Sequence, residues 1–268
     1  MSAVSDSPSV LERVIRRDRL VMAYGLAVIT VLAWIYLVRA AASMNAMAGE
    51  AAMHAAMGMV MTQSWGLGDW LGLFVMWAVM MAAMMLPSAA PVILLVLGAY
   101  RRRGDSRARA AAFMFVAGYA LAWTAFSAAA SAAQVGLHRA ALLAADMRSS
   151  STTLSGAILL IAGVYQWLPI KNACLAHCQS PLGFLSRYWR EGTVGGLVMG
   201  VRHGLFCVGC CWVLMALLFV VGVMNLLWVA ALAALVLVEK LFRGGSVFGR
   251  VAGVAMGAWA VYLFVSSS

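Results

Sequence analysis

Charged residues are scarce in this chain. Only 10% of its 268 residues are Asp, Glu, Lys or Arg, and 65% are apolar, whereas a soluble domain is about a quarter charged and about half apolar. A soluble single domain is therefore excluded. The mean hydropathy of +0.93 requires most of the chain to lie in a lipid bilayer. At about 20 residues per helical span, the length allows about six or seven spans.

The sequence also lacks the residue patterns of common catalytic sites. Acidic residues number nine in the whole chain, and the apolar runs contain almost none of them. There is no Gly-rich phosphate-binding loop with its Lys and Ser or Thr, and there is no nucleophile elbow. We therefore expect a protein that is not an enzyme.

Long apolar runs predict an all-α fold, a polytopic transmembrane helix bundle of about seven spans. We expect a basic tail at residues 1–19, a single membrane domain at residues 20–265, and a Met-rich outer loop at residues 41–69. The predicted spans are Leu20 to Val38, Trp70 to Tyr100, Ala110 to Val135, Leu154 to Leu168, Gly204 to Met224, Leu226 to Val238 and Val247 to Val265.

The basic residues predict the orientation of the bundle. Of the 19 Lys and Arg residues, all but Arg39, Arg139 and Arg148 fall on the side of the N-terminus. Because positive residues gather on the cytoplasmic side, we expect the N-terminus in the cytoplasm and the C-terminus outside, in a bacterial-type inner membrane. This placement explains the net charge of +10 without a nucleic acid. The expected partner is the lipid bilayer, with a membrane-protein partner or a homo-oligomer left open.

Sulfur is abundant, in 19 Met and five Cys residues. Cys174 and Cys178 are four residues apart, and Cys207, Cys210 and Cys211 are three and four apart, so a helix would place each set on one face. In the predicted topology both sets lie near the cytoplasm, where clustered cysteines are metal ligands or redox thiols more often than disulfides. Thiolates suit Cu(I), zinc or iron–sulfur clusters. Because the spacing does not match paired zinc knuckles, we expect Cu(I), and zinc less so.

A row of possible Cu(I) ligands at steps of four strengthens this interpretation. In the alternative interpretation, Cys and Met are packing residues and His203 caps a helix that enters the headgroups. The row consists of Met199, His203, Cys207, Cys211 and Met215.

Two further histidines are candidate ligands. His177 lies three residues after Cys174 and could reach the same site, or it is a solvated loop histidine. His54 lies in the predicted outer loop among many methionines, where thioether and imidazole could collect copper. The alternative is a short amphipathic segment on the membrane surface. The methionines around His54 are Met44, Met47, Met53, Met57, Met59 and Met61.

A second methionine row runs down the predicted second span. Met80 and Met84 continue from Met76 at steps of four, and the row ends at Pro87 and Pro91. Such a row is usual packing, but thioethers could also pass a soft monovalent ion without the cost of burying a carboxylate. The prolines can break the helix and create an irregular site.

Three sequence segments that contain these residues occur together and in order. They are Met76–Pro91 (MWAVMMAAMMLPSAAP), Lys171–Pro181 (KNACLAHCQSP) and Cys207–Met215 (CVGCCWVLM). With them, residues 70–265 resemble the domain-of-unknown-function family described as predicted metal-binding integral membrane proteins. The resemblance does not extend to the segment around His54. It implies as ligands Cys174, Cys178, Cys207, Cys210 and Cys211.

Glu239 and Lys240 follow the sixth predicted span. We expect their side chains to mark the membrane interface by snorkelling. The alternative is that Glu239 pairs with a base from a neighbouring helix.

The sequence thus predicts an inner-membrane copper-handling protein that holds Cu(I) on cysteines near the cytoplasmic face. Two alternatives stay open. One is a metal-free scaffold or auxiliary subunit of a larger membrane complex. The other is a membrane thiol oxidoreductase that uses Cys207 and Cys210, which have the two-residue gap of redox pairs.

Overall fold

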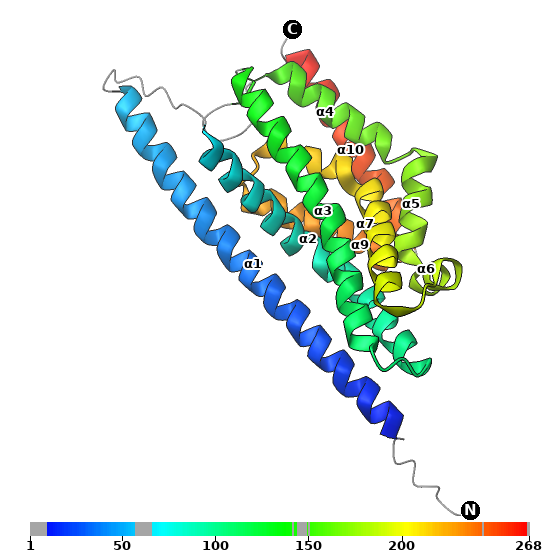
Figure 1. The fold of residues 1–268 in the computed structure, drawn as a ribbon. Coiled ribbons are helices and arrows are strands. Elements are labelled where there is room, and N and C mark those ends of the chain that lie inside the picture. The colour runs from blue at the N-terminus through cyan, green and yellow to red at the C-terminus, as the bar shows by residue number, and fades with distance from the viewer. Residues whose placement is uncertain are drawn as a thin grey trace, which may run out of the picture.

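The computed structural model describes residues 10–56, 66–140, 142, 143, 149, 151–242 and 244–266. These residues fold into helices packed as one bundle (Figure 1), which confirms the all-α prediction. The helices are α1 (Val10–Ala56), α2 (Leu67–Arg102), α3 (Ala108–Arg139), α4 (Thr152–Tyr165), α5 (Pro169–Gln179), α6 (Pro181–Tyr188), α7 (Gly192–Ala216), α8 (Leu218–Val221), α9 (Leu226–Leu241) and α10 (Gly245–Ser266).

Several of these helices could cross a membrane. Among the described residues, five helical stretches are long and apolar enough, and α4 and α5 pass the same test only as a pair bent by 63°. Helix α9 has 16 residues, which is fewer than a span needs. The count of about seven spans and their orientation stay predictions. The five stretches are Glu12–Met44, Leu67–Arg102, Ala108–Arg139, Gly192–Val221 and Gly245–Ser266.

The outer surface of the bundle is apolar along α1 and α10. Tyr24 on α1 is 74% exposed and Val265 on α10 is 72% exposed, with many Leu, Val and Ile side chains beside them. Soluble monomers rarely expose an apolar surface of this extent. Helices of this length with such a surface are long and apolar enough to cross a membrane.

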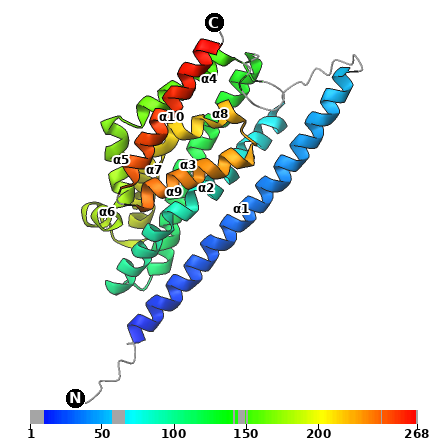
Figure 2. The same ribbon diagram turned by 180° about the vertical axis from the view of Figure 1, so that it is seen from behind.

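Basic segments gather at one end of the molecule. The N-terminal end of α1, the connection between α2 and α3, and α6 lie together there, and the C-terminal ends of α1 and α10 lie at the other end (Figures 1 and 2). Asp18 on α1 accepts a hydrogen bond of 2.7 Å from Arg101 Nε on α2, which ties the two helices at the basic end.

Glycines let α3 and α7 approach closely at the centre. Gly196 and Gly200 on α7 lie directly against the backbone carbonyl groups of Ala111 and Phe115 on α3, so no side chain fits between the two backbones. On the other side of the bundle, a Cβ on Gly253 of α10 would lie 2.8 Å from the carbonyl oxygen of Gly163 on α4. Glycines thus make close helix–helix contacts on both sides of the bundle.

The bend between α4 and α5 aims the first cysteine pair at the core. Leu168 is extended, with φ −68° and ψ 139°, and Pro169 opens α5, as is typical of a residue before proline and of proline in a first helical turn. The segment that carries Cys174 and Cys178 is therefore a helix that packs on α7 and α9, and not a loose connection.

Three other expectations were wrong in detail. Helix α2 continues through Pro87 and Pro91 without a break. Helix α1 continues to Ala56, so the predicted loop at 41–69 begins as helix, because Ala and Met are strong helix formers. Helix α7 begins at Gly192 rather than Gly204, since its glycine-rich first turns are held against α3.

Candidate metal centre

Cysteines from two helices meet where α5 packs on α7. Cys178 on α5 neighbours Cys207 and Cys210 on α7. One turn earlier, Cys174 lies against the backbone of α7, since a Cβ on Gly209 would be 2.9 Å from its sulfur. All five cysteines are free thiols. The structure thus brings together the two sets that the sequence separates.

The predicted row on α7 is buried along its whole length. Its members are each at most 3% exposed, namely Met199, His203, Cys207, Cys211 and Met215. Cys210 and Cys211 both direct their thiols at the carbonyl oxygen of Cys207, at 3.1 and 2.9 Å. The row therefore faces the protein interior, where a bound ion would be shielded from water.

Lys240 reaches into this interior. It is 5% exposed, and its Nζ lies 2.9 Å from Cys207 Sγ, 3.2 Å from Ser88 Oγ and 3.7 Å from Met85 Sδ. The Tyr119 hydroxyl group contacts the same Cys207 sulfur at 3.0 Å. The expectation that Lys240 snorkels to the interface is wrong, because Lys240 lies on the buried face of α9.

Glu239 points in a different direction from Lys240, since adjacent helical residues are about 100° apart around the axis. Its two carboxylate oxygens accept hydrogen bonds of 2.6 and 2.8 Å from Lys171 Nζ on α5, and both side chains are at most 2% exposed. Gln166 also contacts the Lys171 ammonium group, and Gly249 of α10 lies against the carboxylate. The alternative interpretation, in which Glu239 pairs with a base from a neighbouring helix, is confirmed.

His203 sits above Cys207 by one helical turn, enclosed by aromatic rings. Its ring centroid lies 5.9 Å from those of Phe115 and Tyr119 and 5.0 Å from that of Phe184. Its Nδ1 is buried and has no hydrogen-bond partner among the described residues. Because an unpartnered buried nitrogen is costly, this atom is open to a ligand.

His177 is engaged elsewhere. Its Nδ1 lies 2.9 Å from the Ala173 carbonyl oxygen, its Nε2 lies 3.4 Å from the Tyr188 hydroxyl group, and its ring stacks on Phe206 at 4.0 Å. To bind a metal, His177 would have to give up one of these contacts.

The methionine row of α2 is buried beside the site. Met80 and Met84 are at most 2% exposed, but the thioether that contacts the Lys240 ammonium group belongs to their neighbour Met85. The side chain of His54 and residues 57–65 of the predicted outer loop lie outside the described residues.

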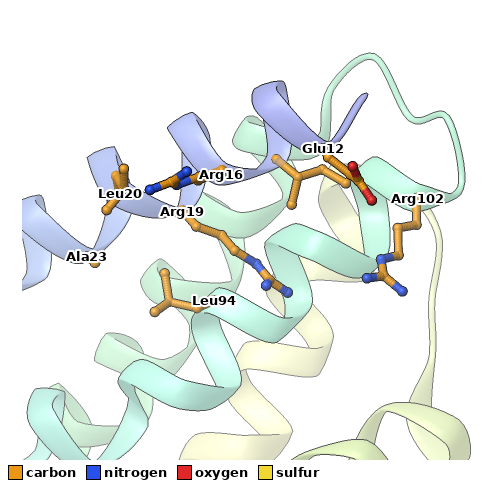
Figure 3. A pocket seen from close by; sticks show the side chains of 8 residues that line it. Glu12, Arg16, Arg19, Leu20, Ala23, Leu94 and Arg102 are labelled. Atoms are coloured by element: carbon orange, nitrogen blue, oxygen red, sulfur yellow. The ribbon is translucent and has the colours of Figure 1, made fainter. Parts of the chain in front are cut away.

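A hollow between α1 and α2 lies away from the cysteines, near the basic end. The side chains of Glu12, Arg19 and Arg102 converge there (Figure 3). Its lining offers no sulfur or imidazole and so does not suit a soft metal. The lining residues are Glu12, Ile15, Arg16, Arg19, Leu20, Ala23, Leu94 and Arg102.

The donors around Cys207 fit a soft metal ion by their chemistry. Within the described ranges, no group of three or more His, Cys, Asp or Glu side chains is arranged as it stands to hold a metal ion. Cys178 on α5 nevertheless neighbours Cys207 and Cys210 on α7, and His203, whose Nδ1 has no partner among the described residues, lies one turn from Cys207 on α7. Thiolate and imidazole are donors that copper accepts.

Sequence reasoning did not assign Lys171, Lys240, Tyr119, Ser88 or Met85 to this site. The two lysines carried a usable signal, because an ionisable residue next to an apolar run is a functional candidate by default. Tyr119 and Ser88 carried no such signal in the sequence, since their roles depend on how α2 and α3 pack against α7.

The described chain is an all-α protein with the long apolar helices of a membrane protein and a buried thiol–lysine centre. Its residues 74–263 match the PpoB2 family model, which is described as a copper chaperone, and the chain belongs to this family. No curated protein and no solved structure matches it. The copper part of the expected function is therefore confirmed at the level of the family.

Proposed function

We propose that this chain is an inner-membrane copper-handling protein that holds Cu(I) as cargo on Cys178, Cys207 and Cys210. The observation that carries the proposal is the placement of Cys178 of α5 beside Cys207 and Cys210 of α7. Membership of a family described as a copper chaperone supports copper as the cargo. We assign the protein binding and transfer of the ion, and no catalysed reaction.

The chemistry of the donors favours Cu(I) over zinc. Structural zinc sites use four ligands in a tetrahedron, whereas soft thiolate and thioether ligands select Cu(I). The possible ligands near Cys207 are two further thiols, the Met85 thioether and the buried His203 imidazole, and most of these are soft donors. Burial also keeps water away from the bound ion.

We further propose that copper reaches the thiols past the methionines of α2. Met80, Met84 and Met85 are buried along this helix, and Met85 is adjacent to the Lys240–Cys207 contact. Thioethers would hold the ion loosely and thiolates would hold it tightly, so the difference in ligand strength would favour movement toward the cysteines.

Burial counts against the thiol oxidoreductase alternative. A redox pair must be reached by the thiol of its partner, but Cys207 and Cys210 are each 1% exposed. The scaffold alternative predicts a protein that leaves the membrane only within a larger complex and that carries no metal, so copurification distinguishes it.

Copper content tests the proposal. We expect anaerobically purified protein to bind about one Cu(I) per chain, Cys178→Ser to lose most of it, and Cys174→Ser to keep most of it, because the Cys174 sulfur lies against the backbone of α7 at Gly209. Both variants replace a cysteine sulfur with oxygen, at positions one helical turn apart on α5, so each is a control for the other. Elemental analysis of the folded variants measures the result, and equal copper in Cys178→Ser and wild type would contradict the proposal.

A further inference from the structure

The centre of the bundle carries three charged side chains among the described residues, Lys171, Glu239 and Lys240. The last of them lacks a carboxylate partner within the described residues. Lys171 and Glu239 neutralise each other. Lys240 forms no ion pair with a carboxylate in the described part of the chain. An unbalanced cation at this depth costs several kcal/mol.

The contacts of Lys240 indicate what balances it. Its nearest atom is Cys207 Sγ at 2.9 Å, followed by the Ser88 hydroxyl oxygen and the Met85 sulfur. The hydroxyl and the thioether carry no charge, so Cys207 is the group among these three that can become an anion. Cys207, which neighbours Cys178 of α5, also contacts the Tyr119 hydroxyl group at 3.0 Å.

We propose that Lys240 is the counter-ion of the bound metal, and that it balances the single negative charge of one Cu(I) held by two thiolates. The inference rests on the proposed function. It assigns the site to a soft monovalent cation and makes Lys240 a positioning residue that acts through Cys207.

The charges balance in a simple way. A cysteine binds metal as its thiolate, so its proton is released to water. When Cys207 and one of its two neighbours bind as thiolates and the third thiol keeps its proton, one monovalent ion and two thiolates carry a net charge of minus one, and the Lys240 ammonium group brings the sum to zero. The Lys171–Glu239 pair adds nothing to this sum. The complex can therefore lie inside the bundle without an uncompensated charge.

The test measures how tightly purified, detergent-solubilised protein binds Ag(I), a soft monovalent ion that undergoes no redox change, and then Cu(I) under anaerobic conditions, each against a competing chelator. We expect Lys240→Met to weaken binding of both ions by about 10- to 100-fold, as the loss of a group that supports a metal ligand does. Lys240→Arg, which keeps the charge, should restore most of this loss. The control Arg250→Met removes a positive charge from the exposed face of α10 and should leave binding unchanged.

A merely structural lysine would give a different pattern. If Lys240 acts through Cys207, the losses caused by Lys240→Met and Cys207→Ser overlap instead of adding in the double variant. Unchanged ion affinity in a folded Lys240→Met protein, or equal losses in Lys240→Met and Lys240→Arg, would overturn the inference and leave the proposed function intact. Failure of wild-type protein to bind either ion would overturn both.

Discussion

Replacing Glu239 with Gln lowers the free energy of unfolding by about 3–5 kcal/mol, the cost of breaking a buried ion pair by removing one partner. The variant keeps the shape of the side chain but leaves the Lys171 ammonium group without its carboxylate at a position that is at most 2% exposed. Gln166 can offer only a neutral oxygen in its place. Unfolding by denaturant in detergent micelles, followed by tryptophan fluorescence, measures the loss.

A second variant separates charge from packing. Replacing Lys171 with Met together with Glu239→Leu removes both charges, and this double variant should recover most of the stability, because apolar residues of similar volume often replace a buried pair without net cost. Wild-type stability in Glu239→Gln would contradict the prediction, since it would mean that the pair is not buried in the folded protein.

Cys207→Ser is expected to have the largest effect on copper. Cys207 neighbours Cys178 and contacts the Lys240 ammonium group and the Tyr119 hydroxyl group. Its loss therefore removes a ligand and leaves these two supporting groups without the sulfur that they contact. We expect the affinity for Cu(I) to fall by more than about 100-fold, because loss of a supporting group alone costs about 10- to 100-fold. Competition with a Cu(I) chelator under anaerobic conditions measures it.

Met215→Leu is the matched control for this variant. Met215 is fully buried near the end of the same helical row, two turns beyond Cys207, and the substitution conserves volume. It should change Cu(I) affinity little. A result in which both variants lose copper equally would indicate that α7 packing, rather than the Cys207 sulfur, governs binding.

The composition of the chain predicted the fold class because apolar runs of span length leave few alternatives to helices. It predicted the ends of helices less well. Gly192 opens α7 through packing against α3, and Pro87 sits inside α2, and neither outcome follows from local preference. The 63° bend at Pro169 had a local signal in the proline, but its direction depends on how α5 packs.

The candidate site was predictable where helical spacing decides neighbours. Steps of three and four placed Cys207, Cys210 and Cys211 on one buried face, as the structure has them. Contacts between helices were not predictable in this way. Whether Lys240 contacts Cys207 depends on where α9 crosses the bundle. A shift of one residue along α2 decides that Met85, rather than Met84, contacts the lysine.

X-ray absorption spectroscopy at the copper edge, on wild-type protein loaded anaerobically with one equivalent of Cu(I), tests the central claim most directly. The account predicts monovalent copper whose nearest neighbours are sulfur, with that sulfur signal depleted in Cys178→Ser. Copper surrounded by nitrogen and oxygen alone, or a spectrum that Cys178→Ser leaves unchanged, would contradict it.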